Sequence, residues 1–590
     1  MVGVISPSIG NLTFLRELLL MDNGFNGDIP KTIGHLHRLQ HLNMSFNSIQ
    51  SSIPAGLSNC SELRVIDFSS NNLTGVIPVE LGYLSKLDQL ILDNNSFLSV
   101  IPSSLGNVSS LTKLSINCGV GSSSRSCLKG NIPEQLGNLA NLRLIDLSGN
   151  MLSGTIPPSF FNLSLLHTLA VMVNQLHGSL PPSIGTSLPR LKRLKLAGNG
   201  FTGPIPVSLS NASRLAVIEL SQNNFSGRIP PDIGRAENIW FLNLELNQLE
   251  ANDVSDWRFM DSLTNCSGLQ ILALDNNKLA GELPSSIANL SKEIEQILLG
   301  GNSISGSLPS GIQNLVSLFG LDITDNQLTA TIPEGIGKLY NLQFFGLTSN
   351  RITGRIPASI GNLTQLTSLY LNDNDLEGPI PPALGNMLRL NELELSMNRL
   401  NGSIPVEILS LPYLSNFIVL SNNLLSGSLP IEVGLLRNVR MLNLSSNRLS
   451  GEIPMTLAAC ESLELLKLDD NLIQGYGVDG QVTTSGDVYS YGILLLEMLT
   501  GIRPADRMFQ NGLTLRRLVE MQISNDGVLK IIDPLMLSEN HARRESECLV
   551  SVARVGLSCS TDSPYERPNM VDVAAKMLAI KVAYLGDIVP

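Results

Sequence analysis

Aromatic and charged residues are both scarce in this chain of 590 residues, at 5% and 15% of the composition. So few aromatic side chains argue against a typical enzyme core. The apolar content of 43% is too high for a disordered chain. The formal net charge is −12 and no basic run is present, which argues against a nucleic-acid-binding protein. The length favours several domains or one long repeat array.

Long apolar runs are missing as well. A helix that crosses a bilayer needs roughly 20 consecutive apolar residues, and the segment Tyr-Gly-Ile-Leu-Leu-Leu-Glu-Met-Leu is less than half as long. The first residues contain no basic start, no apolar run of signal length and no small-residue cleavage site. We therefore expect no signal peptide and no membrane span in the chain as written, and the sequence leaves its location open.

Catalytic and metal-binding motifs are absent too. Six histidines and no G-x-S-x-G motif leave no pairing of nucleophile and base, and no Cys or His cluster has zinc spacing. The chain has no G-x-G-x-x-G loop, V-A-I-K lysine, H-R-D, D-F-G or A-P-E motif. The Gly- and Ser-rich stretch 119–126 lies inside a repeat and is no phosphate loop. Because phosphoryl transfer depends on positioning ATP and metal, we expect no catalysis, cofactor or metal.

A 24-residue repeat dominates what is present, with the template L-x-x-L-x-L-x-x-N-x-L-x-G-x-I-P. Its asparagine recurs from Asn23 to Asn471, and one degenerate turn fits between Asn95 and Asn150, which gives about nineteen turns. The alternating leucines predict a short strand with one buried face. The asparagine amide can bond backbone groups that the turn leaves unpaired, Gly permits a tight reversal, and Pro fixes the chain after it.

No single turn can bury its leucines alone, so neighbouring turns must stack. The predicted fold is an α/β repeat solenoid: a right-handed leucine-rich-repeat arc of about nineteen turns with a concave parallel β-sheet, followed by a small α-helical fragment.

The L-x-G-x-I-P element resembles the plant-specific class of leucine-rich repeats. Two segments, ISPSIGNLTFLREL at the start and Leu249–Gln270, resemble the plant receptor-like serine/threonine kinases of the subfamily that includes immune receptors for bacterial patterns. The resemblance covers about residues 1–475. It implies repeats outside the cell and a protein at the plasma membrane. Such receptors begin with a signal peptide and a disulfide-bearing cap, whereas this chain begins inside the first repeat.

The segments SGDVYSYGILLLEMLTGIRPAD and Cys559–Leu578 resemble the last third of a plant receptor-like kinase domain. The resemblance implies that Asp487 matches the Asp that holds the catalytic loop and that Arg567 matches the Arg that pairs with the Glu of A-P-E. We divide the chain into repeats 1–475, a junction 476–485, a partial kinase C-lobe 486–580 and a tail 581–590.

The junction is typical of a deletion that removed the last repeats, the membrane span and most of the kinase. The sequence does not distinguish a true deletion from an error in the gene model. We expect the helical segment to pack poorly alone or to dock on the open end of the repeats, because its inferred partners are missing.

Two irregularities interrupt the period. The surplus between Asn95 and Asn150 includes Cys118 and Cys127, which either form a disulfide or stay free thiols in a bulge. The longer spacing before Asn277 contains Trp257, which predicts a convex-side excursion covered by the indole. Three further cysteines recur at one repeat position and are expected to be buried small hydrophobes; they are Cys60, Cys266 and Cys460.

Acceptor sequons for N-glycosylation occur only before residue 475, which agrees with a lumenal first part. Those at Asn43 and Asn443 fall on strand positions that face the concave side. The fourteen acceptors are Asn11, Asn43, Asn59, Asn72, Asn94, Asn107, Asn162, Asn211, Asn224, Asn265, Asn289, Asn362, Asn401 and Asn443.

The variable positions of the strands point into solvent from a rigid scaffold, and such a surface suits recognition. In the middle of the array they hold the mixture of aromatic and charged residues that interfaces use, although they are equally the solvated positions of any such sheet. The candidate ligand residues are Met172, Val173, Arg193, Lys195, Glu219, Phe241, Asn243, Glu245, Asp322, Phe344, Tyr370, Glu392 and Glu394.

We interpret the chain as a recognition module of receptor-kinase descent, in plant immune or developmental signalling, without enzymatic activity. Its expected partners are a peptide or protein ligand on the concave face and a co-receptor kinase, and no nucleic acid. The alternative is a serine/threonine receptor kinase whose N-lobe, catalytic loop and membrane span are lost through an incomplete gene model. A protein like the polygalacturonase inhibitors would have a signal peptide and no kinase remnant, and both expectations fail.

Overall fold

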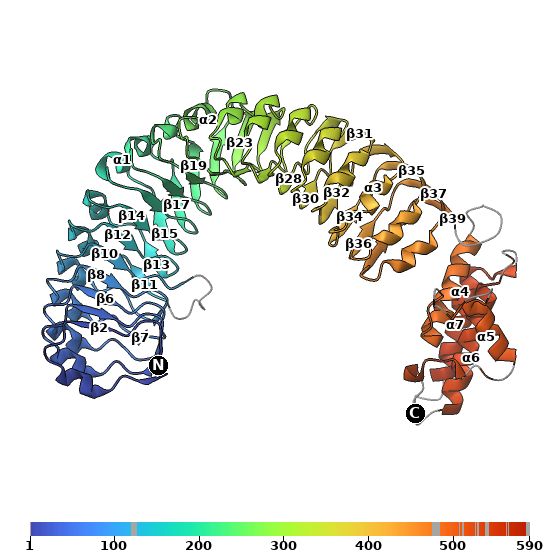
Figure 1. Cartoon of the computed structure of the whole chain (residues 1–590), viewed down its shortest axis with the longest axis horizontal. Coiled ribbons are helices and arrows are strands. Elements are labelled where there is room, and N and C mark those ends of the chain that lie inside the picture. The colour runs from blue at the N-terminus through green and yellow to red at the C-terminus, as the bar shows by residue number, and fades with distance from the viewer. Residues whose placement is uncertain are drawn as a thin grey trace. The chain divides into compact units, whose positions relative to one another are not determined.

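The computed structural model describes residues 2–119, 127–474, 484–504, 506, 508–509, 513–524, 527, 530–536, 542–561, 563 and 566–585. The chain forms two compact units, Met1–Asn374 and Asp375–Pro590, and both are drawn in Figure 1. The domain boundaries predicted at residues 475, 485 and 580 stay predictions, and most of the junction lies outside the described residues.

One turn of the first unit shows how the template folds. Leu63, Ile66 and Phe68 come from its L-x-x-L-x-L segment and are fully buried. The strand β6 (Val65–Asp67) alternates between half-buried and buried side chains, as a strand with one core face should. Pro78, with φ at −62°, then starts a 3₁₀ helix on the other side of the turn. Burying one such leucine is worth about 2 kcal/mol, and the array repeats this in every turn.

Among the described residues the parallel strands of the concave face number nineteen, fifteen in the first unit and four in the second. This number matches the predicted count of turns, and the solenoid fold is confirmed. In the first unit the strands are β2 (Glu17–Leu19), β4 (His41–Asn43), β6, β8 (Gln89–Ile91), β10 (Lys113–Ser115), β12 (Leu144–Asp146), β14 (Thr168–Ala170), β16 (Arg193–Lys195), β18 (Val217–Glu219), β20 (Phe241–Asn243), β22 (Ile271–Ala273), β24 (Gln296–Leu298), β26 (Gly320–Asp322), β28 (Phe344–Gly346) and β30 (Ser368–Tyr370).

A second series of short parallel strands follows the asparagine of each turn. In the first unit it consists of β1 (Val2–Val4), β3 (Gly24–Gly27), β5 (Ser48–Ile49), β7 (Thr74–Gly75), β9 (Ser96–Phe97), β11 (Lys129–Asn131), β13 (Met151–Gly154), β15 (Gln175–Gly178), β17 (Gly200–Gly203), β19 (Asn224–Arg228), β21 (Gln248–Ala251), β23 (Lys278–Glu282), β25 (Ser303–Gly306), β27 (Gln327–Leu328) and β29 (Thr353–Gly354).

Short helices complete the turns of the first unit. They are the 3₁₀ helices η1 (Pro7–Asn11), η2 (Lys31–His35), η3 (Ala55–Asn59), η4 (Val79–Tyr83), η5 (Ser103–Asn107), η7 (Glu134–Asn138), η8 (Pro158–Asn162), η9 (Val207–Asn211), η10 (Ile233–Arg235), η11 (Ser285–Asn289), η12 (Ser310–Asn314), η13 (Glu334–Lys338) and η14 (Ala358–Asn362), with the α-helices α1 (Ile184–Ser187) and α2 (Arg258–Leu263).

The template asparagines form a ladder that joins one turn to the next. The amide nitrogen of Asn223 donates to the carbonyl oxygens of Leu220 at 3.2 Å and Ser221 at 2.9 Å in its own turn, and of Leu196 at 3.1 Å in the preceding turn. Its Oδ1 accepts the N–H of Phe201, 3.0 Å away in the preceding turn. The asparagine therefore satisfies the backbone groups that the bend leaves unpaired, as the sequence predicts.

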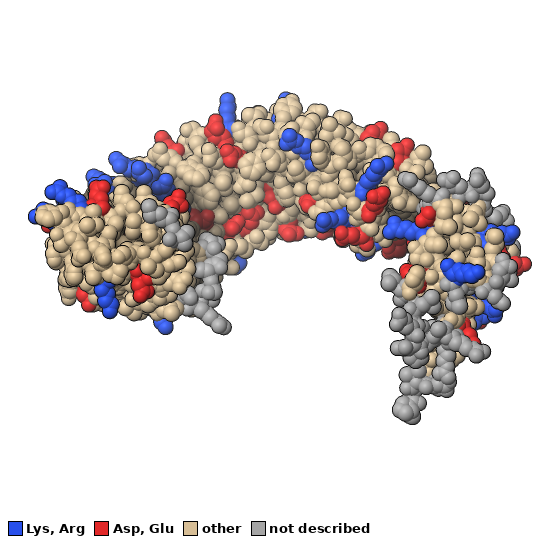
Figure 2. Space-filling model, turned by 60° about the horizontal axis from the view of Figure 1, so that its bottom comes forward, with Lys and Arg blue, Asp and Glu red and all other residues tan. Residues whose placement is uncertain are grey.

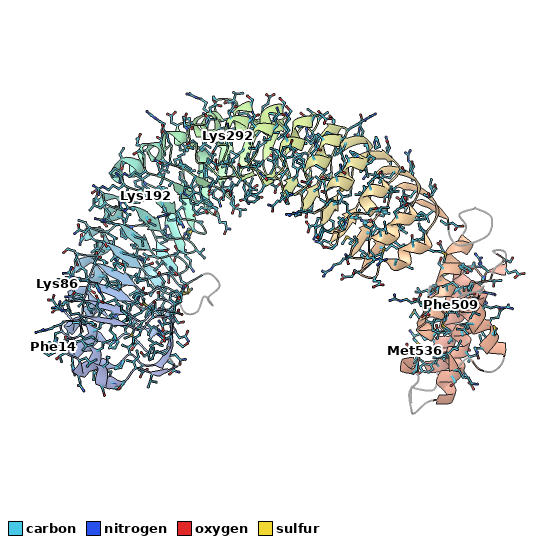
Figure 3. All side chains as sticks on the ribbon, in the orientation of Figure 1. Phe14, Lys86, Lys192, Lys292, Phe509 and Met536 are labelled. Atoms are coloured by element: carbon cyan, nitrogen blue, oxygen red, sulfur yellow. A yellow bond between two sulfur atoms is a disulfide. The ribbon has the colours of Figure 1, made fainter. Side chains whose placement is uncertain are left out.

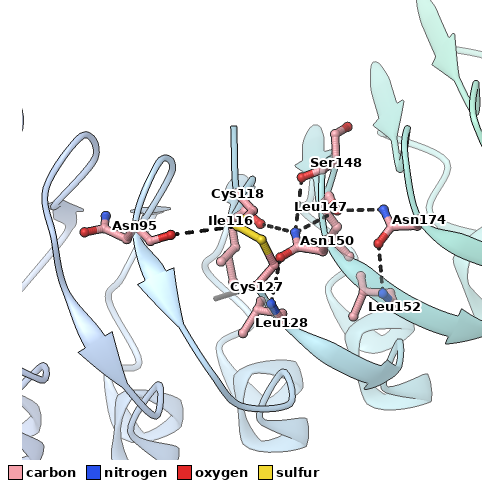
Figure 4. Close-up of a disulfide and its surroundings, with 10 residues drawn as sticks. All are labelled: Asn95, Ile116, Cys118, Cys127, Leu128, Leu147, Ser148, Asn150, Leu152 and Asn174. Atoms are coloured by element: carbon pink, nitrogen blue, oxygen red, sulfur yellow. Dashed lines mark hydrogen bonds between the residues drawn. A yellow bond between two sulfur atoms is a disulfide. The ribbon is translucent and has the colours of Figure 1, made fainter. Parts of the chain in front are cut away.

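The first irregularity of the array is closed by a disulfide between Cys118 and Cys127, with an S–S distance of 1.95 Å (Figure 4). In this degenerate turn Gly119 occupies the position of the ladder asparagine. The carbonyl oxygen of Asn95 lies 3.9 Å from Cys118 Sγ, and Asn150 resumes the ladder by accepting the N–H of Leu128 at 3.0 Å. Residues 120–126, including most of the Gly- and Ser-rich stretch, lie outside the described residues.

The second irregularity folds as expected around a buried indole. Trp257 is 1% exposed, and its Nε1 donates to the carbonyl oxygen of Ala280 at 2.8 Å. Its ring stacks on Phe259, with 5.4 Å between centroids. Beside it the fully buried carboxylate of Asp256 forms an ion pair with Arg228 Nε at 2.7 Å. The extra residues thus supply a local core in which α2 takes the place of a 3₁₀ helix.

The second unit continues the same turns and ends in helices. The repeat elements are β31 (Asp375–Pro379), η15 (Pro382–Asn386), β32 (Glu392–Glu394), β33 (Arg399–Gly402), α3 (Val406–Leu409), β34 (Phe417–Val419), β35 (Leu424–Ser428), η16 (Ile431–Leu435), β36 (Met441–Asn443), β37 (Arg448–Glu452), η17 (Met455–Ala459), β38 (Leu465–Lys467) and β39 (Leu472–Gln474). The later elements are α4 (Thr484–Thr500), α5 (Leu515–Ser524), η19 (Pro534–Met536), α6 (Ala542–Cys559) and α7 (Met570–Leu585).

The four α-helices at the carboxy-terminal end make two small apolar clusters of their own. Leu494 and Met498 of α4 remain more than half exposed, so part of this apolar helix is covered and part is not. Docking of the helices on the repeats stays a prediction. Among the described residues no helix is both long and apolar enough to cross a membrane. The clusters contain Val488, Leu495, Leu496, Leu499, Leu515, Val519, Ile532, Ala553, Val555, Cys559 and Val573.

Candidate ligand-recognition surface

The register of the parallel strands arranges the variable positions of the first unit in rows. The first row holds the first residue of each strand, the second row the third residue, and the third row the residue two positions beyond the strand. From β16 to β30 the first row reads Arg193, Val217, Phe241, Ile271, Gln296, Gly320, Phe344 and Ser368. The second row reads Lys195, Glu219, Asn243, Ala273, Leu298, Asp322, Gly346 and Tyr370.

These rows bring several of the predicted ligand residues together. Lys195, Glu219 and Asn243 are consecutive in the second row. Phe344 and Tyr370 come from neighbouring strands and touch, with 5.5 Å between ring centroids. Both rings are half-buried, so each has an apolar surface that faces solvent.

The other candidates are more dispersed. Arg193 and Phe241 share the first row but are separated by Val217. Met172 is half-buried, whereas Val173 is 58% exposed and has a φ of 52°, the left-handed conformation that most residues before the ladder asparagine adopt. Four further candidates are half-buried, two in the first unit and two on β32 of the second unit: Glu245, Asp322, Glu392 and Glu394. A ligand role for any of the thirteen stays a prediction.

The floor of the surface between the aromatic residues is made of short side chains. Ala273 is buried, and Gly320 and Gly346 have no side chain. A Cβ added to Gly346 would lie 2.9 Å from Asp322 Oδ1 and 3.0 Å from Phe344 Cε1, so a larger residue here would have to displace these side chains. Gly320 and Gly346 are themselves buried, so the side chains around them, Phe344 and Asp322 among them, form the exposed surface here.

Two carboxylates of this surface are held by their neighbours. Glu219 Oε1 accepts from the hydroxyl and the N–H of Ser221 at 2.6 and 3.2 Å, and its Oε2 accepts from Asn243 at 3.3 Å. Burial raises the pKa of Glu219 above its usual value, and the charge of Glu245 adds to the rise. In the second unit, burial likewise raises the pKa of Glu394.

Asp275, which sequence reasoning missed, has the most perturbed carboxyl group of the surface. Burial raises its pKa to about 7, and the charges of Asp322 and Glu245 act in the same direction. Its Oδ1 accepts the N–H of Gly300 at 2.6 Å. Asp275 occupies the third row, like Met172 and Glu245, so the repeat template could have pointed to it.

Sequence reasoning also missed an aromatic residue and a group of cations. Trp240 directly precedes β20, is 40% exposed and packs edge-on against Phe241 at 5.6 Å. Arg143 and Lys192 occupy the same position before β12 and β16. His167 lies between them before β14. Burial lowers the pKa of His167, and the charges of Lys192, Arg143, Arg190 and Arg214 lower it further.

The predicted sequons fall into two groups. Twelve of the acceptor asparagines are exposed, and seven of these are the last residue of a 3₁₀ helix. The two on concave strands are half-buried, and Asn43 Oδ1 accepts from the N–H and hydroxyl of Ser45 while Asn443 Oδ1 does the same for Ser445. Glycosylation of all fourteen stays a prediction.

The two kinase-like residues lie in the helical part of the second unit. Asp487 is exposed in the first turn of α4. Arg567 donates through Nε to the carbonyl oxygen of Thr561 at 2.7 Å, and its guanidinium lies 4.7 Å from the ring centroid of Tyr489. The charge of Asp487 is therefore exposed to solvent, and the charge of Arg567 has the carbonyl of Thr561 and the ring of Tyr489 as partners. In the part of the chain described, no three His, Cys, Asp or Glu residues gather in a way that could hold a metal ion.

Family models for leucine-rich repeats match residues 13–73, 141–163, 190–212, 214–236, 268–290, 341–363, 365–387 and 438–460. A receptor-like protein kinase of Arabidopsis thaliana is 44% identical over 114 residues, 19% of this chain and 11% of the relative. The receptor kinase-like protein Xa21 of Oryza sativa subsp. japonica is 42% identical over 116 residues, 18% of this chain and 11% of the relative. The matched part thus spans 11% of the length of these relatives.

Solved structures match over a much larger share. The plant peptide hormone receptor RGFR1, in complex with RGF2, is 32% identical with a TM-score of 0.68, over 83% of this chain and 81% of that chain. The PEPR1–AtPEP1 complex is 33% identical with a TM-score of 0.71, over 80% and 68%. The Arabidopsis receptor kinase HAESA, with the peptide hormone IDA and the co-receptor SERK1, is 31% identical with a TM-score of 0.69, over 80% and 81%. This chain belongs to the family of plant leucine-rich-repeat receptor-like proteins.

Proposed function

We propose that the concave face of Met1–Asn374 recognises an extended peptide ligand. The observation that carries the proposal is the pair Phe344 and Tyr370, whose half-buried rings touch on neighbouring strands of the concave face. Aromatic side chains with an exposed apolar surface are the residues on which interfaces most often anchor a ligand. RGFR1 is a peptide hormone receptor in complex with RGF2, and the HAESA structure contains the peptide hormone IDA, which supports the same class of ligand here.

The experiment is peptide capture by the purified full chain. Plant and microbial peptide pools are passed over the immobilised protein, and bound peptides are identified by mass spectrometry. Phe344→Ala should weaken binding of a captured peptide about ten-fold or more, because it removes an apolar anchor. Tyr340→Ala is the matched control, since Tyr340 is 58% exposed and lies after η13, outside the rows. Failure to capture any peptide, or equal effects of the two variants, contradicts the proposal.

We also propose that recognition proceeds without catalysis. The support is the absence from the sequence of the motifs with which kinases hold ATP and metal. The relatives named above are receptor kinases, which keeps the serine/threonine kinase as the second candidate. Incubation of the full chain with labelled ATP and Mg²⁺, beside an active receptor kinase, separates the two: transfer of label to the chain or to a generic substrate favours the second candidate.

Membership of a receptor family supports repeats that lie outside the cell at the plasma membrane. A co-receptor kinase is supported as a partner, since one neighbouring structure contains the co-receptor SERK1. The twelve exposed sequons make this testable. Expression of the repeats behind a secretion signal in plant cells, followed by glycosidase treatment, should reduce the apparent mass; an unchanged mass contradicts the placement.

A further inference from the structure

The concave side of the first unit separates its charges. A group of five exposed cations, here called the cation cluster, lies at one edge of the sheet: Arg143, Lys192 and Arg193 are at the start of β12 and β16, and Arg190 and Arg214 are in the segments that lead from α1 into β16 and from η9 into β18. Figure 3 shows the place of Lys192 on the first unit. Four half-buried acids, here called the carboxylate cluster, lie on and beyond β18 to β26; they are Glu219, Glu245, Asp275 and Asp322. Figure 2 shows acidic side chains along the inner face of the array.

The cation cluster has no neutralising partner of its own. Within the described ranges, none of its five members forms an ion pair with a carboxylate. Four of them lower the pKa of His167 together with burial, so their positive potential converges on one point of the surface. Such a concentration of positive charge stands out in a chain whose net charge is −12. Unpaired cations that share one potential attract an anionic group.

The carboxylate cluster is close to the cations but cannot neutralise them. Lys195 and Glu219 face one another across β16 and β18 and mark the border between the two groups. Glu219 is already bound by Ser221 and Asn243, Asp275 by the N–H of Gly300, and Asp322 by the N–H of Thr324 at 3.0 Å. Three of the four acids are thus fixed in place by backbone and side-chain donors, with no cation among these partners.

The spacing of the clusters suits one continuous ligand. Three strand spacings of about 4.8 Å separate β16 from β22, and about four residues of strand separate the first row from the third. The cluster centres therefore lie roughly 20 Å apart on a diagonal, which about six residues of extended chain can cover. The aromatic residues Trp240 and Phe241 lie at the start of β20, between β16 and β22, and Phe344 and Tyr370 lie beyond the acids.

We infer that the ligand is an extended peptide with opposite charges at a fixed spacing. Its acidic residues bind the cation cluster, its basic residues bind the carboxylate cluster, and about six residues separate the two. An apolar or aromatic residue between them packs against Phe241. The inference rests on the proposed peptide recognition and adds the chemistry and the placement of the ligand. Charge complementarity of this kind sets specificity and association rate more than affinity alone.

The test is a selection from random displayed peptides of about twelve residues, twice the expected spacing, on the immobilised full chain. The inference predicts enrichment of sequences with acidic and basic residues about six positions apart. Binding of a selected peptide should weaken with salt, because exposed charges are screened. Enrichment of neutral peptides, of purely acidic peptides or of purely basic peptides overturns the inference while leaving peptide recognition in place. Failure to enrich any peptide overturns both.

Charge-neutral variants assign the two ends. Lys192→Gln with Arg193→Gln should weaken binding of a selected peptide about ten-fold, and Glu245→Gln with Asp322→Asn should do the same. Removing the acidic residues of the peptide should make the first variant indistinguishable from the wild type, and removing its basic residues should do so for the second.

The matched control is Lys292→Gln with Glu293→Gln, two exposed charges after η11. Equal losses in the control pair, or losses that ignore which charges the peptide carries, overturn the inference. Circular dichroism shows that each variant is folded before binding is compared.

Discussion

The side-chain amide of Asn247 donates a hydrogen bond to the carbonyl oxygen of Leu220, 3.0 Å away in the preceding turn of the array. Its Oδ1 accepts the N–H of Phe225 from that same turn at 2.9 Å. Asn247 is 3% exposed, so water cannot replace either bond. One side chain therefore satisfies a donor and an acceptor of its neighbour, and the ladder couples each turn to the one before it.

Asn247→Ala should open the array locally. The substitution leaves the N–H of Phe225 and the carbonyl of Leu220 buried without partners, at a cost of about 3 kcal/mol. Because a long repeat array need not unfold in one step, the measurement is hydrogen exchange at the amide of Phe225. Its protection should fall by about two orders of magnitude. Asn238→Ala is the control, since Asn238 is exposed and its amide donates to the carbonyl oxygen of Ser213 at 2.7 Å; protection lost equally in both variants would contradict the ladder.

The half-buried Asp275 predicts a pH dependence of stability. Its pKa is about 7 in the folded chain, against an ordinary value of 3.8. Between these two pH values the folded state holds a proton that the unfolded state has lost, so stability falls as pH rises and is lowest above the folded pKa. Asp275→Asn should raise the free energy of unfolding at pH 8 by up to about 4 kcal/mol and change it little at pH 4.

Denaturant titration at both pH values measures this difference. Asp325→Asn provides the control, because Asp325 is an exposed carboxylate two turns further along. A stabilisation by Asp275→Asn that is the same at both pH values would show that the carboxyl group ionises normally in the folded chain.

The disulfide between Cys118 and Cys127 predicts a second local effect. Replacing both cysteines by serine removes the closure of a short loop, worth about 2.5 kcal/mol on the chain-entropy account. The loss should appear at the N–H of Leu128, which Asn150 binds next to the bridge, and not in distant turns. Cys548→Ser is the control, since Cys548 is a free thiol in the second unit. Unchanged exchange at Leu128 would mean that the asparagine ladder alone holds this turn.

The repeat fold was predictable from the sequence because its determinants are local and repeated. Leu63, Ile66 and Phe68 fill template positions whose burial depends only on the adjacent turns, and Asn223 bonds within its own turn and the preceding one. The sequence alone left the pairing of Cys118 with Cys127 open. A disulfide needs close Cα atoms, which lie 5.7 Å apart in the structure. The template does not fix the path of the insertion that brings them together.

The chemistry of the site was less predictable, because it depends on which rows lie side by side and how deeply each residue is buried. Glu219 was identified from its position, but the rise of its pKa follows from burial and from Glu245 in the next turn. Asp275 was missed although it shares the third row. The cations that surround His167 come from three different turns, and only the register of the strands brings them together.

The two tryptophans of the chain offer a matched pair for the last prediction, since one is buried and one is on the concave side. Trp257→Phe keeps most of the buried ring but leaves the carbonyl of Ala280 without the donor that lies 2.8 Å away, at a cost of about 1.5 kcal/mol. Trp257→Ala also opens a cavity beside Phe259 and should cost about 4 kcal/mol. Trp240→Phe, at a site that is 40% exposed, should change stability by less than about 0.5 kcal/mol. Denaturant titration followed by circular dichroism compares the three variants. The insertion is held by a buried indole and by the ion pair of Asp256 with Arg228. The loss of stability should therefore be largest in Trp257→Ala, smaller in Trp257→Phe and smallest in Trp240→Phe. A larger loss in Trp240→Phe than in Trp257→Phe would show that the insertion contributes nothing to the core.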